Sequence, residues 1–232
     1  MGADDPLDRL VEERAAEPAI RTEFRSQLDE LEGGLIAAAE QVADAIVPLT
    51  TTFLDGDHAA ADEWLLRHRQ LTRVCRDLEE LGYVVLARQS PVAGDLRRVV
   101  TVVRASGDVQ RTGNLLRHIA SSLTWIDPTT LPGGLRRIIE EFGEVVSTIF
   151  HGAVEAWRGH DSLAAVELQR LDDRADELQR ALLTEIHEGR CSVEEAVSLA
   201  LIARYYERIG DHGVELGRGV TYAMTGERLM ES

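Results

Sequence analysis

RYYERIGDHGVELG, residues 204–217, is the stretch around which this sequence is organised. Apolar residues recur in and around it every three or four positions, which is the spacing of an amphipathic helix. On such a helix Glu207 and Asp211, four residues apart, lie one above the other on the same face. Stacked carboxylates repel each other, so the spacing predicts a compensating group: a bound cation, the neighbouring Arg208, or water.

A second pair of carboxylates lies upstream in QRLDDRADELQR, residues 169–180. Asp172 and Asp176 are again four residues apart. If the two helices pack antiparallel, the four carboxylates converge between them, as they do in helical bundles that build oxygen-ligand metal sites. Carboxylates at this spacing are also common on solvated helix surfaces, so the residues alone leave both interpretations open.

Helical periodicity runs along nearly the whole chain and predicts six helices in two sets of three. The clearest linker, DPTTLPGG at residues 127–134, separates the two sets. The segment 109–114 aligns with 206–211 at an offset of 208 − 111 = 97, with arginine and glycine kept at both places. We therefore predict an all-α fold of two tandem three-helix bundles related by a pseudo-twofold axis.

The expected boundaries follow from composition. Residues 1–19 are charged and contain two prolines, so we expect an N-terminal extension there and a first helix that begins at Arg21. The first three-helix repeat is expected over 20–126 and the second over 135–227.

Three helix ends are predicted from local sequence. Ser90 suits an N-cap followed by Pro91 at the first helical position. Ser192 and Glu195 have the spacing of a capping box. Gly226 lies where a helix-terminating glycine belongs.

Composition excludes several classes of protein. The chain has 232 residues, a net charge of −16 and a pI near 4.8, which argues against a general nucleic-acid binder. Only residues 60–125 are mildly basic, with 10 arginines against 7 acids. No apolar run approaches a membrane span, and Cys75 and Cys191 have no metal-type spacing, so we expect a protein of the reducing cytosol.

RYYERIGDH, residues 204–212, resembles the signature of the PhoU family, the accessory regulators of bacterial high-affinity phosphate transport. Three further segments match this family: QSPVAGDLR at 89–97, LDDRAD at 171–176 and VTYAMTGE at 220–227. The resemblance extends from about Arg21 to Glu227. It implies the same architecture of two PhoU-like three-helix repeats.

The resemblance also implies a metal site. PhoU-like proteins bind metal ions through Glu or Asp, three residues, then Asp, on two helices of each repeat. In this sequence the matching residues are Asp172, Asp176, Glu207 and Asp211. We expect divalent cations, iron or zinc at this C-terminal site, with Asp173 and His212 as adjacent candidates. For His212 itself we expect surface exposure rather than ligation.

The first repeat departs from that pattern. His68 and Thr72 occupy the positions of the first carboxylate pair, and Gln110 and Asn114 occupy those of the second. Neutral amides are poor ligands for a cluster of cations. We therefore expect one metal site per chain, in the C-terminal repeat.

The implied function is negative regulation of phosphate-starvation signalling and of phosphate uptake in the cytoplasm. The implied partners are the ATPase subunit of the phosphate ABC transporter and a membrane sensor histidine kinase, and a homodimer is expected. No catalytic motif supports an enzyme: none of the seven histidines follows a Glu by three residues, and phosphate loops and zincin motifs are absent. Two alternatives are an iron-binding bundle with a storage or redox role and a PhoU-like regulator of another transporter.

Overall fold

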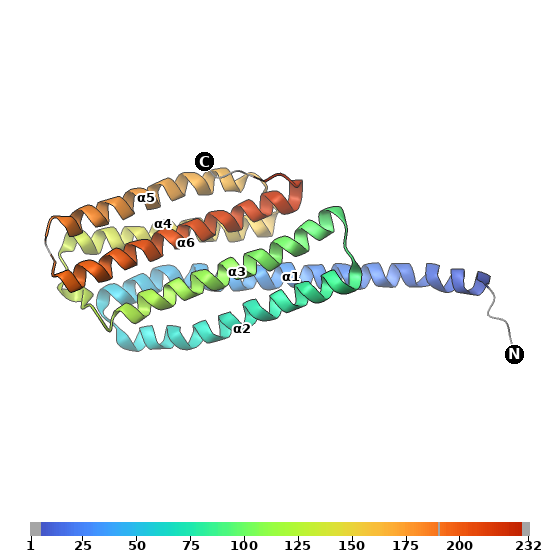
Figure 1. The fold of residues 1–232 in the computed structure, drawn as a ribbon, viewed down its shortest axis with the longest axis horizontal. Helices are drawn as coiled ribbons and strands as arrows, with labels where there is room; N and C mark the ends of the chain where they lie inside the picture. The colour runs from blue at the N-terminus through green and yellow to red at the C-terminus, as the bar shows by residue number, and fades with distance from the viewer. Residues whose placement is uncertain (1–5, 190, 229–232) are drawn as a thin grey trace.

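The computed structural model describes residues 6–189 and 191–228, and within them every long element is a helix. The helices are α1 (Pro6–Asp55), α2 (His58–Gln89), α3 (Ala93–Ser122), α4 (Gly133–Gly159), α5 (Ala164–His187) and α6 (Val193–Thr225). A short 3-10 helix, η1 (Pro128–Thr130), lies in the linker. The predicted all-α fold with two sets of three helices is confirmed (Figure 1).

The first helix is longer than the sequence pattern indicated. It begins at Pro6 rather than Arg21 and continues through Pro18 without a break, while residues 1–5 lie outside the described part of the chain. Its N-terminal part projects beyond the other helices (Figure 1). The expected start of the helix at Arg21 was therefore wrong. Pro18 lacks a backbone N–H donor, but the loss of that one hydrogen bond did not end this long helix.

The two sets of helices share one hydrophobic core. Within each set the helices pack on one another, and α3 packs on α6 while α1 packs on α4 across the two sets. Fully buried aromatic side chains from both sets fill the centre; they are Phe53, Phe142, Phe150, Trp157 and Tyr206. The repeats are thus halves of one continuous bundle.

The turns of the two halves correspond. Gly56 and His160, which end α1 and α4, both adopt positive φ, at 67° and 51°. Asp57 then caps α2 by accepting a hydrogen bond from the Ala60 amide at 3.0 Å. Asp161 plays a similar part by accepting from the Leu163 amide at 2.9 Å. An offset of 104 relates these positions, which places the same turn at the same point of each repeat.

Two of the three predicted helix ends are confirmed. Ser192 and Glu195 form a reciprocal capping box, and Gly226 ends α6 with φ of 81°. The prediction at Ser90 was wrong: Ser90 ends α2 in the left-handed conformation, and α3 begins only at Ala93. The chain reverses direction within three residues there, which requires Ser90 itself as part of the turn.

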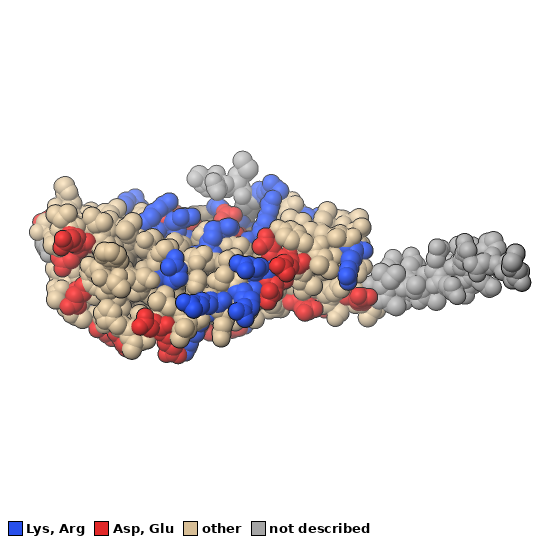
Figure 2. All heavy atoms as spheres, turned by 60° about the horizontal axis from the view of Figure 1, so that its bottom comes forward, with Lys and Arg blue, Asp and Glu red and all other residues tan. Residues whose placement is uncertain are grey.

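Charge is unevenly distributed over the bundle. Figure 2 looks toward the side on which α2 lies, and arginine side chains gather near the middle of this face with acidic side chains on either side. This agrees with the mildly basic composition of residues 60–125, which form α2 and α3.

Candidate metal centre and its counterpart in the first repeat

The four predicted metal-binding residues lie along the contact of α5 with α6, where Asp172 and Glu207 are half-buried and Asp176 and Asp211 are exposed. Asp172, the most interior of them on α5, lies against α6 at Gly210, where a Cβ atom would be only 2.7 Å from its Oδ1. Only a glycine therefore leaves room for this carboxylate. Glu207 lies one turn before Gly210 and Asp211 lies beside it, so the packing of α5 on α6 brings the two pairs within electrostatic reach of each other.

The pKa values show how closely the acids interact. Burial and, after it, the charges of Asp211, Asp176 and Glu207 together raise the pKa of Asp172 to about 7. Burial and the charge of Asp211 also raise the pKa of Glu207. In the absence of a cation this cluster is electrostatically unfavourable, because each carboxylate opposes ionisation of the others.

Arginine compensates the cluster only in part. Glu207 accepts a hydrogen bond from Arg204 through Oε1, but its Oε2 is buried and has no hydrogen-bond partner in the described chain. Burial raises the pKa of Asp211, and the positive charge of Arg204 opposes that rise. Among the described residues the arginine that pairs with the cluster is Arg204, three residues before Glu207, and not Arg208, which the sequence offered as one of three possible compensating groups.

The composition and placement of these side chains fit a hard cation. Their oxygen atoms are the ligands that such ions prefer, and Oε2 of Glu207 is buried among them without a hydrogen-bond partner in the described chain. Within the described residues, however, no three His, Cys, Asp or Glu side chains are already arranged around one point that would hold a metal ion. The metal-ligand role of Asp172, Asp176, Glu207 and Asp211 stays a prediction.

The first repeat has a neutral counterpart of this site between α2 and α3. His68 lies against Gly113 as Asp172 lies against Gly210; a Cβ atom at Gly113 would be 3.3 Å from the His68 ring. Burial lowers the pKa of His68, and the charge of Arg117 lowers it further while nearby Asn114 opposes the shift. A neutral imidazole beside neutral amides thus replaces four carboxylates, as the sequence alignment indicated.

His212 is not at the surface, contrary to the sequence-based expectation. Its side chain is 12% exposed, and its Nδ1 lies 3.3 Å from Oδ1 of Asp108 on α3. Asp108 also binds Arg111 at 2.6 Å. Although burial raises the pKa of Asp108, hydrogen bonds from His212 and Arg111 hold it below its usual range. The interaction of His212 with Asp108 joins the two repeats. Because the two residues lie far apart in the sequence, no local pattern could predict their contact.

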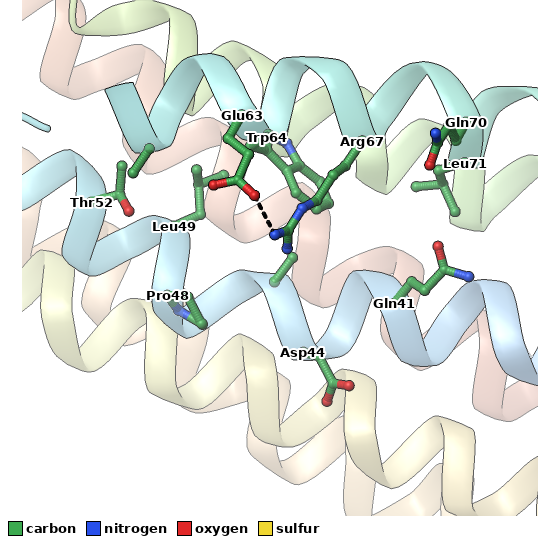
Figure 3. Close-up of a pocket in the computed structure, with 12 residues that line it drawn as sticks. Gln41, Asp44, Pro48, Leu49, Thr52, Glu63, Trp64, Arg67, Gln70 and Leu71 are labelled. Carbon is green, nitrogen blue, oxygen red and sulfur yellow. Dashed lines mark hydrogen bonds and ion pairs between the residues drawn. The ribbon is translucent and has the colours of Figure 1, made fainter. Parts of the chain in front are cut away.

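A separate groove of about 540 Å³ lies between α1 and α2 (Figure 3). Pro48 and Trp64 lie on its two sides, and Glu63 and Arg67 form an ion pair of 2.5 Å at its rim. At the equivalent place of the second repeat Gly152 and Leu168 approach so closely that a Cβ atom would be 2.7 Å from the leucine. The bulky Pro48 and Trp64 of the first repeat correspond to the smaller Gly152 and Leu168 of the second. This difference explains why the groove opens in the first repeat.

Comparison with known proteins identifies the family. The PhoU domain model matches residues 35–123 and 139–220, one match in each repeat. The chain belongs to the PhoU family. The phosphate-specific transport system accessory protein PhoU homolog 2 of Mycobacterium tuberculosis is 32% identical over 210 residues, which cover 89% of this chain and 99% of that protein.

Two solved PhoU structures share the fold. The phosphate transport system regulatory protein PhoU from Streptococcus pneumoniae has a TM-score of 0.81 at 19% identity and covers 90% of this chain and 100% of its own. PhoU from Pseudomonas aeruginosa has a TM-score of 0.81 at 22% identity and covers 88% of this chain and 100% of its own. The two-repeat PhoU architecture inferred from the motifs is therefore confirmed.

Proposed function

We propose that this PhoU-family chain is a cytoplasmic, non-enzymatic regulator that represses phosphate-starvation signalling and restrains phosphate uptake. The observation that carries the proposal is the match to the Mycobacterium tuberculosis protein. That relative is described as an accessory protein of the phosphate-specific transport system, and this chain is similar to 99% of its length. The similarity therefore includes both repeats rather than one shared module.

The proposed partners are the ATPase subunit of the phosphate ABC transporter and a membrane sensor histidine kinase. No helix of the described chain is long and apolar enough to cross a bilayer. The bundle offers a continuous core beneath a charged surface, and charge complementarity would set the orientation and rate of such docking. We also propose a homodimer as the working form.

We propose further that Asp172, Asp176, Glu207 and Asp211 hold a divalent cation, iron or zinc. A bound cation would supply positive charge to this cluster and offset the burial and the carboxylate repulsion that raise the pKa of Asp172. The chain's own part would be to hold α5 against α6 at Gly210, where Asp172 lies close to the α6 carboxylates. The first repeat, with His68 in place of Asp172, would hold none.

The regulatory role is testable in a bacterium that lacks its own PhoU protein and carries a phosphate-starvation reporter. We expect expression of this chain to restore repression of the reporter in phosphate-rich medium. We also expect the phosphate-transporter ATPase to copurify with it. The control bait is an ATPase subunit from an unrelated ABC transporter.

Two results would contradict this proposal. Folded, well-expressed protein that leaves the reporter fully active would remove the repressive role. Selective copurification of the unrelated ATPase would assign the chain to a different transporter.

A further inference from the structure

A second charged site lies where α3 meets the C-terminal part of α6. A hollow of about 260 Å³ opens there between the two helices. Arg104 comes from α3, Arg218 from α6, and Arg228 from the segment that follows α6. We call these three side chains and the space between them the arginine hollow.

Small residues at the floor of the arginine hollow let α3 and α6 approach each other and leave the space above them open. Gly219 faces Thr101 so closely that a Cβ atom would lie 3.0 Å from the threonine methyl group. Ala105, also a small residue, lines the hollow beside them. Tyr222 forms part of the wall, and the guanidinium of Arg228 lies 5.2 Å from the centre of its ring. The ring thus holds one guanidinium at the rim.

The acids that line the arginine hollow are already paired. Glu215 binds Arg218, which also donates to Gln169 at 2.6 Å. Asp108 is shared by Arg111 and His212, as described above. In the described chain no ion pair joins Arg104 or Arg228 to any carboxylate.

Arg97 adds a further positive charge nearby. Its guanidinium lies 3.3–3.5 Å from the place of a Cβ atom on Gly226, at the end of α6. Its Nε is buried and has no hydrogen-bond partner in the described chain. Arg97, Arg104 and Arg228, none of which has an ion pair with a carboxylate in the described chain, therefore lie at one end of the α3–α6 contact. The net charge of the whole chain is −16.

The pseudo-twofold symmetry shows that arginines gather at only one end of the α3–α6 contact. At the offset of 97 residues that relates α3 to α6, Arg104 corresponds to Leu201 and Tyr222 corresponds to Trp125. Leu201 is 49% exposed and Trp125 is 79% exposed. The opposite end of the same contact is therefore apolar, and the arginine hollow is not a by-product of the repeat.

We propose that the arginine hollow binds a phosphate-type oxyanion, either free phosphate or the terminal phosphate of an ester. The planar guanidinium presents its donors in a fork that matches the oxygen spacing of phosphate, and charged hydrogen bonds of this kind are among the stronger ones. The volume suits one such group rather than a larger drug-sized ligand. An anion here neutralises the unpaired Arg104 and Arg228 and links α3 to the end of α6.

The inference adds a ligand to the proposed regulatory role, but its test uses purified protein and does not depend on that role. Full-length, chelator-treated protein is titrated with inorganic phosphate by calorimetry, so that no cation at Asp172 contributes to binding. We expect the variant Arg104→Gln/Arg228→Gln to bind phosphate at least about tenfold more weakly than the wild type, because it loses two charged donors.

The matched control is Arg69→Gln/Arg73→Gln, which removes two exposed charges from α2. We expect it to retain wild-type affinity, and circular dichroism confirms that each variant is folded. Glycerol phosphate is titrated in parallel; tighter binding than that of inorganic phosphate would assign the site to an ester, and tighter binding of inorganic phosphate to the free anion.

Two results would overturn the proposal. The first is an absence of phosphate and glycerol phosphate binding by the wild type at millimolar concentrations. The second is an equal loss of affinity in both double variants, which would indicate diffuse attraction to the basic face and not a site.

Discussion

Asp172 and His68 occupy equivalent positions against a glycine, yet they give the two repeats opposite chemistry. The backbone provides the same space in each case, at Gly210 and at Gly113. In the second repeat a carboxylate with a raised pKa enters that space, and in the first a neutral imidazole does. The side chain that fills the space therefore decides whether a repeat is suited to a cation.

The metal-free protein should lose stability as pH rises from 4 to 7. The pKa of Asp172 is about 7 in the folded chain, above its ordinary value of 3.8. The native state thus binds more protons than the unfolded state in this window, so this group's contribution is fully present below pH 4 and is lost by about pH 7. After allowance for screening by water, we expect a fall of roughly 1–2 kcal/mol.

Urea denaturation of chelator-treated protein at a series of pH values measures this fall. The matched variant Asp172→Asn removes the titrating group and should flatten the profile between pH 4 and 7. An identical slope in the variant would show that Asp172 is not its source.

Gly210 should be needed for the cation site more than for stability. The Cβ atom of Gly210→Ala would lie 2.7 Å from Oδ1 of Asp172, so the carboxylate has to move away. The gain in helix propensity, about 1 kcal/mol, offsets part of the cost to the fold. We expect weaker binding of manganese by calorimetry with little change in the urea midpoint.

Gly107→Ala on α3 is the control, because its Cβ would meet only the end of Arg111 at an ordinary 3.5 Å. It should raise stability slightly and leave metal binding unchanged. Wild-type manganese affinity in Gly210→Ala would show that the position of Asp172 against α6 is not important for the site.

At the scale of helices, the contact of α1 with α4 joins the repeats through an unusually close approach. Thr50 donates a hydrogen bond to the Ile46 carbonyl and shares one of 2.7 Å with the hydroxyl of Tyr206. The Tyr206 ring stacks on Phe142 with centroids 5.2 Å apart. Gly143 lies directly beside Thr50, so α4 fits against α1 only because that position lacks a side chain.

The variant Gly143→Ala should therefore destabilise the whole bundle. Its Cβ atom would lie 2.4 Å from the Thr50 hydroxyl and 2.9 Å from its methyl group, and both residues are buried. Overpacking of this kind costs about 1–3 kcal/mol, more than helix propensity returns. Urea denaturation should show one transition at a lower midpoint. A midpoint equal to or above that of the wild type would contradict this packing.

Helices and the carboxylate cluster were predictable because their signals are local. A period of three to four residues marks each helix, and a spacing of four marks each acid pair. Predicting the antiparallel packing of α5 on α6 then required only the assumption that consecutive helices are neighbours. The contact of His212 with Asp108 and the convergence of Arg104 with Arg228 depend on the register of α3 against α6. Helical periodicity does not specify that register, so these features required the structure.

At the scale of the whole molecule, two similar repeats have diverged around one shared core. The second repeat holds the acid cluster, and the first holds the neutral counterpart and the open groove beside Trp64. The arginine hollow lies at one end of the contact between them. The contacts of α3 with α6 and of α1 with α4 join the two repeats into one bundle.

The most direct test of this account is the number of metal ions bound per chain. Purified protein, stripped and then reloaded separately with manganese, iron and zinc, is analysed for metal by elemental analysis. A variant with Asp172→Asn and Asp211→Asn, and one with Gln110→Ala and Asn114→Ala, are treated in parallel after their folding has been verified. We predict metal at the second repeat only, lost in the first variant and retained in the second. Equal metal content in the wild type and the Asp172→Asn/Asp211→Asn variant, or no metal in any sample, would contradict the asymmetric cation site.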